Sequence, residues 1–104
     1  MSATFDVLAE PTRREILDLL RDRERPVNDL VNRLAISQPG VSKHLRVLRE
    51  AGLVEVRTDA QRRLYRVRAQ PLEEIDAWLA PYRRLWEGTL DALERHLDEE
   101  TEEP

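Results

Sequence analysis

The chain has 104 residues and a mass of 12.2 kDa, which is enough for one domain with one hydrophobic core. It contains no cysteine, so its composition excludes disulfides, thiolate metal sites and cysteine nucleophiles. No apolar run approaches the roughly 20 residues that span a bilayer, and the N-terminus lacks a signal-peptide pattern, so a cytoplasmic protein is expected.

The formal net charge of −4 is unevenly distributed along the chain. Residues 1–70 carry 14 Lys or Arg and 10 Asp or Glu, whereas residues 71–104 carry 3 and 11. Within residues 37–68 alone, 8 basic residues stand against 3 acidic ones. This asymmetry indicates a basic working surface followed by an acidic segment, and such a surface would attract a phosphate backbone.

Hydrophobic periodicity predicts four helices in the first half of the chain. They are expected over about residues 3–9, 11–23, 28–34 and 37–51. Pro11 suits the first turn of the second helix, and Ser37 is well placed as the N-cap of the fourth. Gly52 is expected to adopt a left-handed conformation that ends the fourth helix.

After Gly52 the period changes to two. Val54 and Val56 alternate with charged residues, and Tyr65 and Val67 alternate with Leu64, Arg66 and Arg68. The two runs predict a β-hairpin over about 53–68 around a polar stretch, 58–62, although its turn lacks the usual glycine.

Helical periodicity returns at residue 72, and a helix from 72 to 99 would be roughly 42 Å long. Pro81 is expected to kink or divide it, and residues 99–104 are expected to form a disordered acidic tail. Its own chain cannot cover such a long apolar stripe, so a partner helix is implied, most simply from a second copy. The stripe consists of Leu72, Ile75, Leu79, Tyr82, Trp86, Leu90, Leu93 and Leu97.

The fourth predicted helix has the pattern of a DNA-reading helix. Its apolar residues define one buried face, Lys43 and Arg46 point nearly opposite, and Ser42 lies on a flank. Gln38 and Pro39 lie near its start, where small or amide-bearing groups allow close approach to a surface. Major-groove recognition needs such a rigid helix with exposed donors, but the solvated face of an ordinary amphipathic helix has the same spacing.

Five arginines on the predicted hairpin favour the DNA hypothesis. They could straddle a phosphate backbone, although charges on a hairpin edge also protect against aggregation. These residues are Arg57, Arg62, Arg63, Arg66 and Arg68.

Three stretches of the chain resemble a known family. LAISQPGVSKHLRVLREAGLVEVRTDAQRRLYRV closely resembles the helix-turn-helix and wing of ArsR-type (ArsR/SmtB) winged-helix repressors, and FDVLAEPTRREILDLLRDRERPV is similar to their entry segment. WLAPYRRLWEGTLDAL is similar to a subgroup without metal sites. The resemblance implies a mostly α fold with a small β-hairpin wing. One domain would span 1–98, with the helix-turn-helix at about 27–51 and a dimerisation helix at about 72–98.

The resemblance also implies a homodimer that binds double-stranded DNA. Its interface would include the helix near 3–9, with Phe5 and Leu8, as well as the long C-terminal helix. The residues that match the family's DNA-facing positions are Ser37, Gln38, Ser42, Lys43 and Arg46, with Arg62 and Arg63 in the wing.

Two positions in this region need their own interpretation. The family's recurrent histidine corresponds to His44, which we interpret as a packing and hydrogen-bonding residue. The wing tip has Ala60 and Gln61 where Gly-Arg is usual.

Metal sensing and catalysis are not expected. The family's thiolate motif would fall at 28–32, where there is no cysteine, and the C-terminal helix offers only His96 beside two glutamates. Three glycines and two histidines cannot assemble a phosphate loop or a nucleophile–base arrangement, so neither an enzyme nor a cofactor is predicted.

We therefore predict a dimeric, sequence-specific repressor or autorepressor on promoter DNA. Arg57, Arg62 and Arg63 would supply phosphate contacts. The alternative is a winged-helix interaction module with little DNA binding. Its long helix would bind a protein partner or a small apolar ligand.

Overall fold

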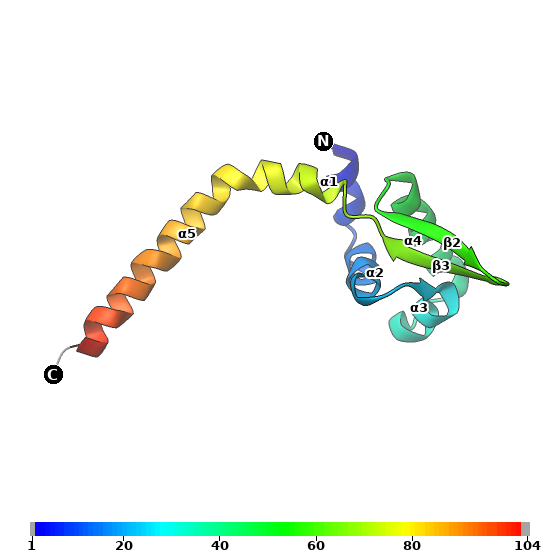
Figure 1. Ribbon diagram of the computed structural model, residues 1–104, viewed down its shortest axis with the longest axis horizontal. Helices are drawn as coiled ribbons and strands as arrows, with labels where there is room; N and C mark the ends of the chain where they lie inside the picture. Colours follow the sequence, from blue (N-terminus) through cyan, green and yellow to red (C-terminus); the bar gives the residue numbers. More distant parts are fainter. Residues whose placement is uncertain (1, 103–104) are drawn as a thin grey trace.

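The computed structural model describes residues 2–102. Helices α1–α4 and a small sheet form a rounded body, and helix α5 begins beside α1 and then extends away from it (Figure 1). The molecule therefore measures 66 × 32 × 23 Å along its principal axes. The elements are α1 Ser2–Leu8, α2 Pro11–Asp22, β1 Arg25–Pro26, α3 Val27–Leu34, α4 Gln38–Glu50, β2 Val54–Asp59, β3 Arg62–Val67 and α5 Leu72–Glu102. The predicted mostly helical fold with a hairpin wing is confirmed.

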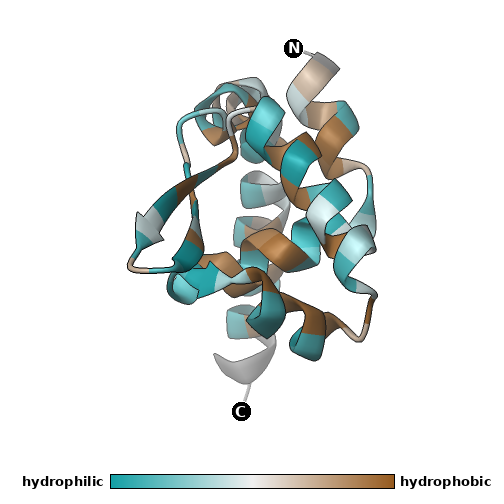
Figure 2. Ribbon diagram, turned by 90° about the vertical axis from the view of Figure 1, so that its right-hand side faces the viewer, coloured by the Kyte–Doolittle hydropathy of each residue, from teal (hydrophilic) through white to brown (hydrophobic). Residues whose placement is uncertain are grey.

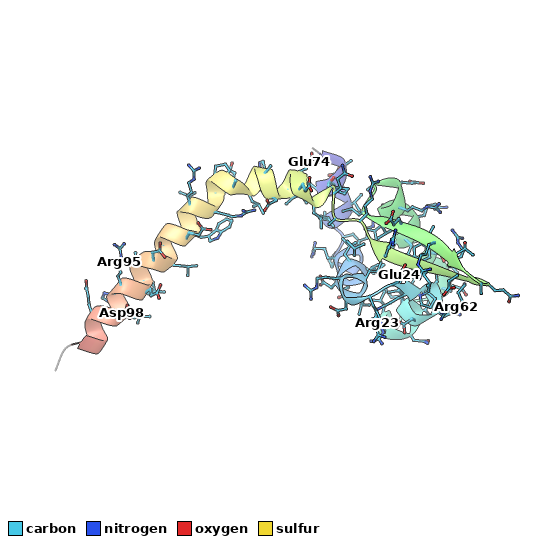
Figure 3. All side chains as sticks on the ribbon, viewed as in Figure 1. Arg23, Glu24, Arg62, Glu74, Arg95 and Asp98 are labelled. Carbon is cyan, nitrogen blue, oxygen red and sulfur yellow. The ribbon has the colours of Figure 1, made fainter. Side chains whose placement is uncertain are left out.

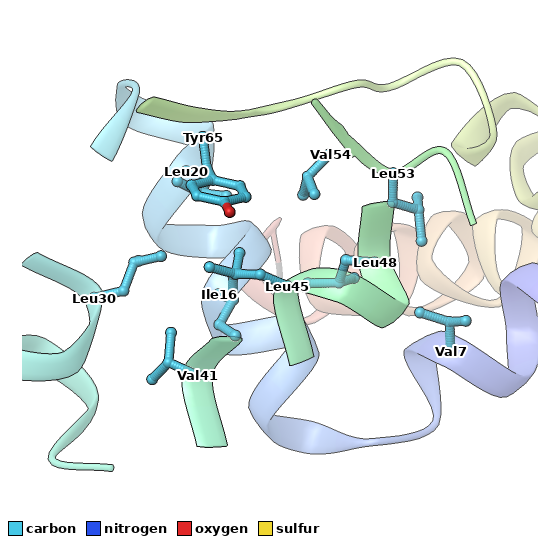
Figure 4. Close-up of a cluster of buried hydrophobic side chains, with 10 residues drawn as sticks. All are labelled: Val7, Ile16, Leu20, Leu30, Val41, Leu45, Leu48, Leu53, Val54 and Tyr65. Carbon is cyan, nitrogen blue, oxygen red and sulfur yellow. The ribbon is translucent and has the colours of Figure 1, made fainter. Parts of the chain in front are cut away.

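One hydrophobic core joins the helices of the body to the sheet (Figure 4). The helices of the body carry both hydrophobic and hydrophilic residues, as amphipathic helices do (Figure 2). Ile16 from α2 and Leu30 from α3 are fully buried against α4, and the sheet covers them from the other side with Val54 and Tyr65. Burial of the apolar face of α4 fixes this helix on the body and leaves its polar face outside.

The sheet has three antiparallel strands in the order β1-β3-β2. Asp59 pairs with Arg62, so only Ala60 and Gln61 form the hairpin tip, where a longer polar turn was predicted. Ala60 adopts a left-handed conformation with φ 57°, which supplies the reversal that glycine usually provides. The strands therefore extend further towards the tip than the alternation of apolar residues indicated.

Strand β1 was not predicted. It consists of two residues, and Pro26 is tolerated because β1 lies at the edge of the sheet. Arg25 is only 6% exposed; its Nε donates to the carbonyl of Leu19 at 2.9 Å, and its Nη1 donates to the carboxylate of Asp29 at 2.7 Å. Arg33 also donates to Asp29, at 3.0 Å. A buried arginine thus ties the edge strand to α2 and α3.

We expect Arg25→Ala to lower the free energy of unfolding by about 2–3 kcal/mol, because it removes two hydrogen bonds and a packed stem. Arg33→Ala is the matched control, since the exposed Arg33 pairs with the same carboxylate and its loss should cost no more than about 0.5 kcal/mol. Urea titration of both variants measures the difference. Equal losses would contradict the role of Arg25 in holding β1.

Helix α5 is a single helix, so Pro81 does not divide it, and the predicted kink is present as a bend. Pro81 lies inside it, and in Figure 1 the helix bends between the part beside α1 and the part leading to the C-terminus. Arg83 donates to the carbonyl of Asp76 at 3.1 Å and to its carboxylate, across the turn that Pro81 disrupts.

The expected disordered tail needs correction. Helix α5 continues to Glu102, because no glycine or proline follows Gly88 until Pro104, and glutamate is a good helix former. Residues 103–104 lie outside the described residues. None of the helices within residues 2–102 combines the length with the hydrophobicity that a membrane-spanning helix requires.

Candidate nucleic-acid interface

Helix α4 is held firmly at both ends. The Oγ of Ser37 accepts a hydrogen bond from the backbone N–H of Gly40 at 3.2 Å, so the predicted N-cap is confirmed. A Cβ on Gly40 would meet Ile36 Cγ2 at 2.9 Å, which explains the glycine at this point. At the other end Gly52 has φ 76°, and the N–H of Leu53 donates to the carbonyl of Leu48 at 2.9 Å. The left-handed Gly52 and this hydrogen bond form the predicted C-terminal end of the helix.

We expect Ser37→Ala to cost about 1 kcal/mol of stability, whereas Ser37→Gly should cost only a few tenths. The reason is that alanine removes the acceptor for the Gly40 N–H without the backbone freedom that glycine brings to a cap position. Urea unfolding of the two variants measures the difference, and equal losses would mean that the cap contributes nothing to α4.

A groove of about 480 Å³ separates α4 from β3. It contains three of the predicted α4 residues, Gln38, Ser42 and Arg46, and one predicted wing residue, Arg63. We call it the α4–β3 groove; its lining residues are Val27, Gln38, Ser42, Leu45, Arg46, Arg49, Arg63 and Tyr65. The structure therefore brings the predicted helix and wing residues to one surface.

The other predicted residues of α4 lie near this groove but do not line it. Ser37, Pro39 and Lys43 are exposed, with Ser37 and Pro39 at the start of α4 and Lys43 one turn further along. His44 is half-buried, and its Nδ1 accepts a hydrogen bond from Arg13 Nε at 3.3 Å. This contact fits its predicted role in packing and hydrogen bonding.

The cations at the α4–β3 groove have no acidic partner. Arg46, Arg49 and Arg63 form no ion pair within the part of the chain that the structure describes, and neither does Lys43 beside them. Arg63 instead lies over the ring of Tyr65, with its guanidinium carbon 5.9 Å from the centroid. The groove therefore presents uncompensated positive charge.

The opposite face of the wing is neutralised. We call it the outer face; it carries Glu55, Arg57, Asp59, Arg62 and Arg66. Arg57 donates to both carboxylate oxygens of Glu24, at 2.7 and 2.9 Å, and Arg66 donates to Glu55 at 2.6 Å. The structure thus does not bring Arg57 together with the other predicted DNA contacts.

Arg62 occupies an intermediate position at the wing tip (Figure 3). It lies 3.7 Å from the carboxylate of Asp59, yet it also lines a second hollow with Gln38, Gln61 and Arg63. Arg62 therefore borders both the outer face and the α4 side of the wing.

The ion pairs of the outer face and of β1 shift the titration of two carboxyls. The hydrogen bonds from Arg57 lower the pKa of Glu24 below its ordinary value of 4.5. The hydrogen bond from Arg25, assisted by Arg33, lowers the pKa of Asp29 below its ordinary value of 3.8. Both groups favour the charged form in the folded protein.

We therefore expect stability to fall in acid. A carboxyl whose pKa is lowered on folding stabilises the protein above its ordinary pKa, and this contribution disappears as the pH falls through the folded pKa. The urea midpoint should thus decrease below about pH 4.5. The double variant Glu24→Gln, Asp29→Asn should be less stable at pH 7 and show a flatter acid limb; an unchanged limb would exclude these two groups as its cause.

Four residues that line the groove were not among the predicted DNA-binding residues: Val27, Leu45, Arg49 and Tyr65. Arg49 was given no role from the sequence, and Tyr65 was assigned only to strand alternation. The spacing of Ser42, Arg46 and Arg49 along one side of α4 was the available signal for Arg49. No sequence signal showed that Tyr65 would support Arg63.

Helix α5 carries a second surface, which is apolar. Its exposed large side chains fall within an arc of about 140°, and we call them the α5 stripe: Trp78, Tyr82, Leu85, Trp86, Leu90, Leu93 and Leu97. Leu85 is the most exposed of them at 68% and was not predicted.

The predicted interface residues nearest the body have neighbours in the chain itself. Phe5 packs edge-on against Trp78 with ring centroids 5.5 Å apart, and Leu8 and Leu72 pack against the core. Ile75 and Leu79 are half-buried. Thr4 also donates to Glu74 at 3.5 Å, where α5 begins beside α1 (Figure 3). The exposed part of the predicted interface thus begins at Tyr82.

No group of three or more His, Cys, Asp or Glu side chains is arranged to hold a metal ion among the described residues. The pattern of surfaces is instead that of a winged helix-turn-helix: α3 and α4 form the helix-turn-helix, and β2 and β3 form the wing.

Comparison with known proteins gives the family. The model for bacterial regulatory proteins of the arsR family matches residues 10–56. Transcriptional repressor SdpR of Bacillus subtilis is 30% identical over 79 residues, which cover 76% of this chain and 88% of that protein. The chain spans only 50–63% of the length of several mycobacterial regulators that it also matches.

Two solved structures of similar proteins support the same family. A possible transcriptional regulator for arsenical resistance has a TM-score of 0.66 and 43% identity, covering 74% of this chain and 80% of its own. The homodimeric winged helix-turn-helix DNA-binding domain of Mb0332 from Mycobacterium bovis has a TM-score of 0.65 and 26% identity, covering 80% of this chain and 78% of its own. The chain belongs to the arsR family of bacterial regulatory proteins, as its sequence resemblance predicted.

Proposed function

We propose that this chain is a sequence-specific repressor that binds promoter DNA as a homodimer in the cytoplasm. Helix α4 of each protomer enters a major groove, and its exposed donors contact base edges. The proposed base-contacting residues are Gln38, Ser42, Lys43 and Arg46, and the backbone at Ser37 and Pro39 approaches the DNA surface.

The observation that carries this proposal is the difference between the two faces of the wing. The arginines of the outer face are paired with carboxylates, whereas Arg46, Arg49 and Arg63 at the α4–β3 groove have no acidic partner in the described chain. Cations without an acidic partner can bind the phosphates of a DNA backbone, and the exposed donors of the adjacent helix α4 can then contact base edges. A solvated helix face would not need this separation.

The proposed phosphate contacts differ from those expected from the sequence. Arg49 lies on α4, Arg63 lies across the groove on β3, and Arg62 lies at the wing tip, so all three can approach a backbone that runs beside the helix. Arg57 is left out, because its guanidinium is engaged by Glu24 on the other side of the sheet.

The α5 stripe supports the dimer. Seven large apolar side chains between 41% and 68% exposed on one helix are costly in water, and a second copy of the same stripe would cover them. A two-fold arrangement would also present two α4 helices to one duplex, as half-site recognition requires.

The alternative, an interaction module with little DNA binding, is not favoured. Binding of a protein partner through α5 does not explain why the arginines at the α4–β3 groove lack acidic partners. Relatives such as SdpR are also named as transcriptional repressors. An apolar stripe on α5 suits either hypothesis and does not separate them.

Fluorescence anisotropy tests the proposal. The purified protein is titrated onto its own upstream DNA and onto a scrambled duplex over a series of salt concentrations. We expect tighter binding to the upstream DNA, with a log–log salt slope of about −0.9 for each phosphate contacted. Equal, weak binding to every duplex from the surrounding genome would contradict sequence-specific repression and favour the interaction module.

A further inference from the structure

We propose that the α4–β3 groove is also a binding site for a small aromatic carboxylate, which competes with DNA for the same arginines. The competition rests on the proposed function, whereas the site itself is argued from the groove alone. Its volume of about 480 Å³ lies within the usual range for small-molecule sites, about 300–1,000 Å³.

The floor of the groove is apolar and rigid. Leu45 and Tyr65 are 1% and 8% exposed and belong to the hydrophobic core, and Val27 lies beside them at the start of α3. A flat hydrocarbon body placed on this floor would lose its contact with water without any rearrangement of the core. The floor therefore suits an apolar group, and we take an aromatic ring as that group because it buries a large apolar area at little cost in conformational entropy.

The rim of the groove selects an anion. Arg46, Arg49 and Arg63 stand around the floor, and none of the residues that line the groove is acidic. A guanidinium binds a carboxylate through two parallel hydrogen bonds, which an uncharged group cannot replace. The contact of Arg63 with the Tyr65 ring holds this guanidinium at the edge of the floor before any ligand arrives.

Another hollow, which lies beside β1 and the outer face of the wing, does not offer the same chemistry. It measures about 510 Å³ and contains Arg25, Arg57 and Arg62, but Glu24, Asp29 and Asp59 line it as well. These carboxylates already accept hydrogen bonds from Arg57 and Arg25 or lie beside Arg62. Anion binding there would require ion pairs to break, whereas the α4–β3 groove has none to break.

This site implies a direct form of induction. A carboxylate bound to Arg46 and Arg63 would occupy the positions that base edges and phosphates need in the DNA complex. Release from DNA would then follow from competition for one surface and would require no change in the dimer.

The test uses 2-naphthoate as the probe and the uncharged 2-naphthamide as its isostere. Backbone amide spectra of the ¹⁵N-labelled full chain are recorded during titration with each compound. We expect naphthoate to shift amides of residues 42–49 and 63–65, and naphthamide to bind about tenfold more weakly, because it lacks the charge-assisted hydrogen bonds. Arg63→Gln should weaken naphthoate about tenfold, whereas Arg66→Gln on the outer face should leave its affinity unchanged.

Other outcomes overturn the proposal. Equal shifts with naphthamide would show that the arginine rim does not contribute to binding, and shifts confined to the α5 stripe would place the probe elsewhere.

The competition with DNA is tested with the operator duplex, which should displace naphthoate from the groove. A chain that binds its operator but shows no naphthoate shifts in the groove would overturn the site and leave the repressor proposal intact. Naphthoate binding in the groove without any DNA binding would support the site and contradict the repressor proposal.

Discussion

The double variant Lys43→Ala, Arg46→Ala should lose specific DNA binding while remaining folded and dimeric. Both side chains are exposed on α4 and form no ion pair in the described chain, so their removal leaves no buried charge behind. Each base contact is worth about 1–3 kcal/mol of discrimination, so two losses should weaken operator binding by at least 30-fold or so. Anisotropy on operator and scrambled duplexes measures the change.

The matched control is Arg21→Ala, Arg66→Ala. It also removes two positive charges, but from positions away from the α4–β3 groove. We expect it to lower affinity for all duplexes slightly and equally, through the long-range field alone. If both double variants weaken binding to the same extent, net charge rather than α4 would explain affinity, and the assignment of α4 as the reading helix would be wrong.

Leu90→Glu should convert the dimer into a monomer. Leu90 is 59% exposed and lies within the α5 stripe, where a second copy would surround it with leucine side chains. A carboxylate at this position would have to be buried without a partner, which costs several kcal/mol per protomer. Sedimentation equilibrium should give the 12.2 kDa chain mass for the variant and twice that mass for the unaltered protein.

Ala80→Glu adds the same charge to the opposite side of α5 and should remain dimeric. Operator affinity should follow the assembly state, because one α4 helix contacts only half of a two-fold site. A dimeric Leu90→Glu protein would show that the stripe is not the interface.

Much of the body could be predicted from the sequence because local patterns and tertiary packing agree there. The apolar residues of α4 recur at helical spacing, Ser37 offers a cap oxygen, and Gly52 accepts the left-handed conformation, so each signal indicates the same helix. The same holds for the alternation of Val54, Val56, Tyr65 and Val67, which places the hairpin correctly.

The features that were missed depend on partners distant in the sequence. Strand β1 exists because Arg25 pairs with Tyr65, 40 residues later, and nothing in Arg-Pro alone indicates a strand. Arg57 and Arg63 are both arginines of the wing. Arg57 is hydrogen-bonded to Glu24, whereas Arg63 lies over the ring of Tyr65 and has no acidic partner in the described chain. Which arginines remain available for DNA is therefore set by tertiary contacts, and local periodicity carries no information about them.

The bend and reach of α5 have a consequence for gene dosage. Beyond Pro81 the helix extends away from the body, and most of the stability of a protein helix comes from packing of its apolar face rather than from the helix alone. We therefore expect the far half of α5 to gain much of its order from the second copy, so that helix content rises with protein concentration. The cell would then contain competent repressor only above a threshold abundance, and a small drop in synthesis near that threshold would release the promoter steeply.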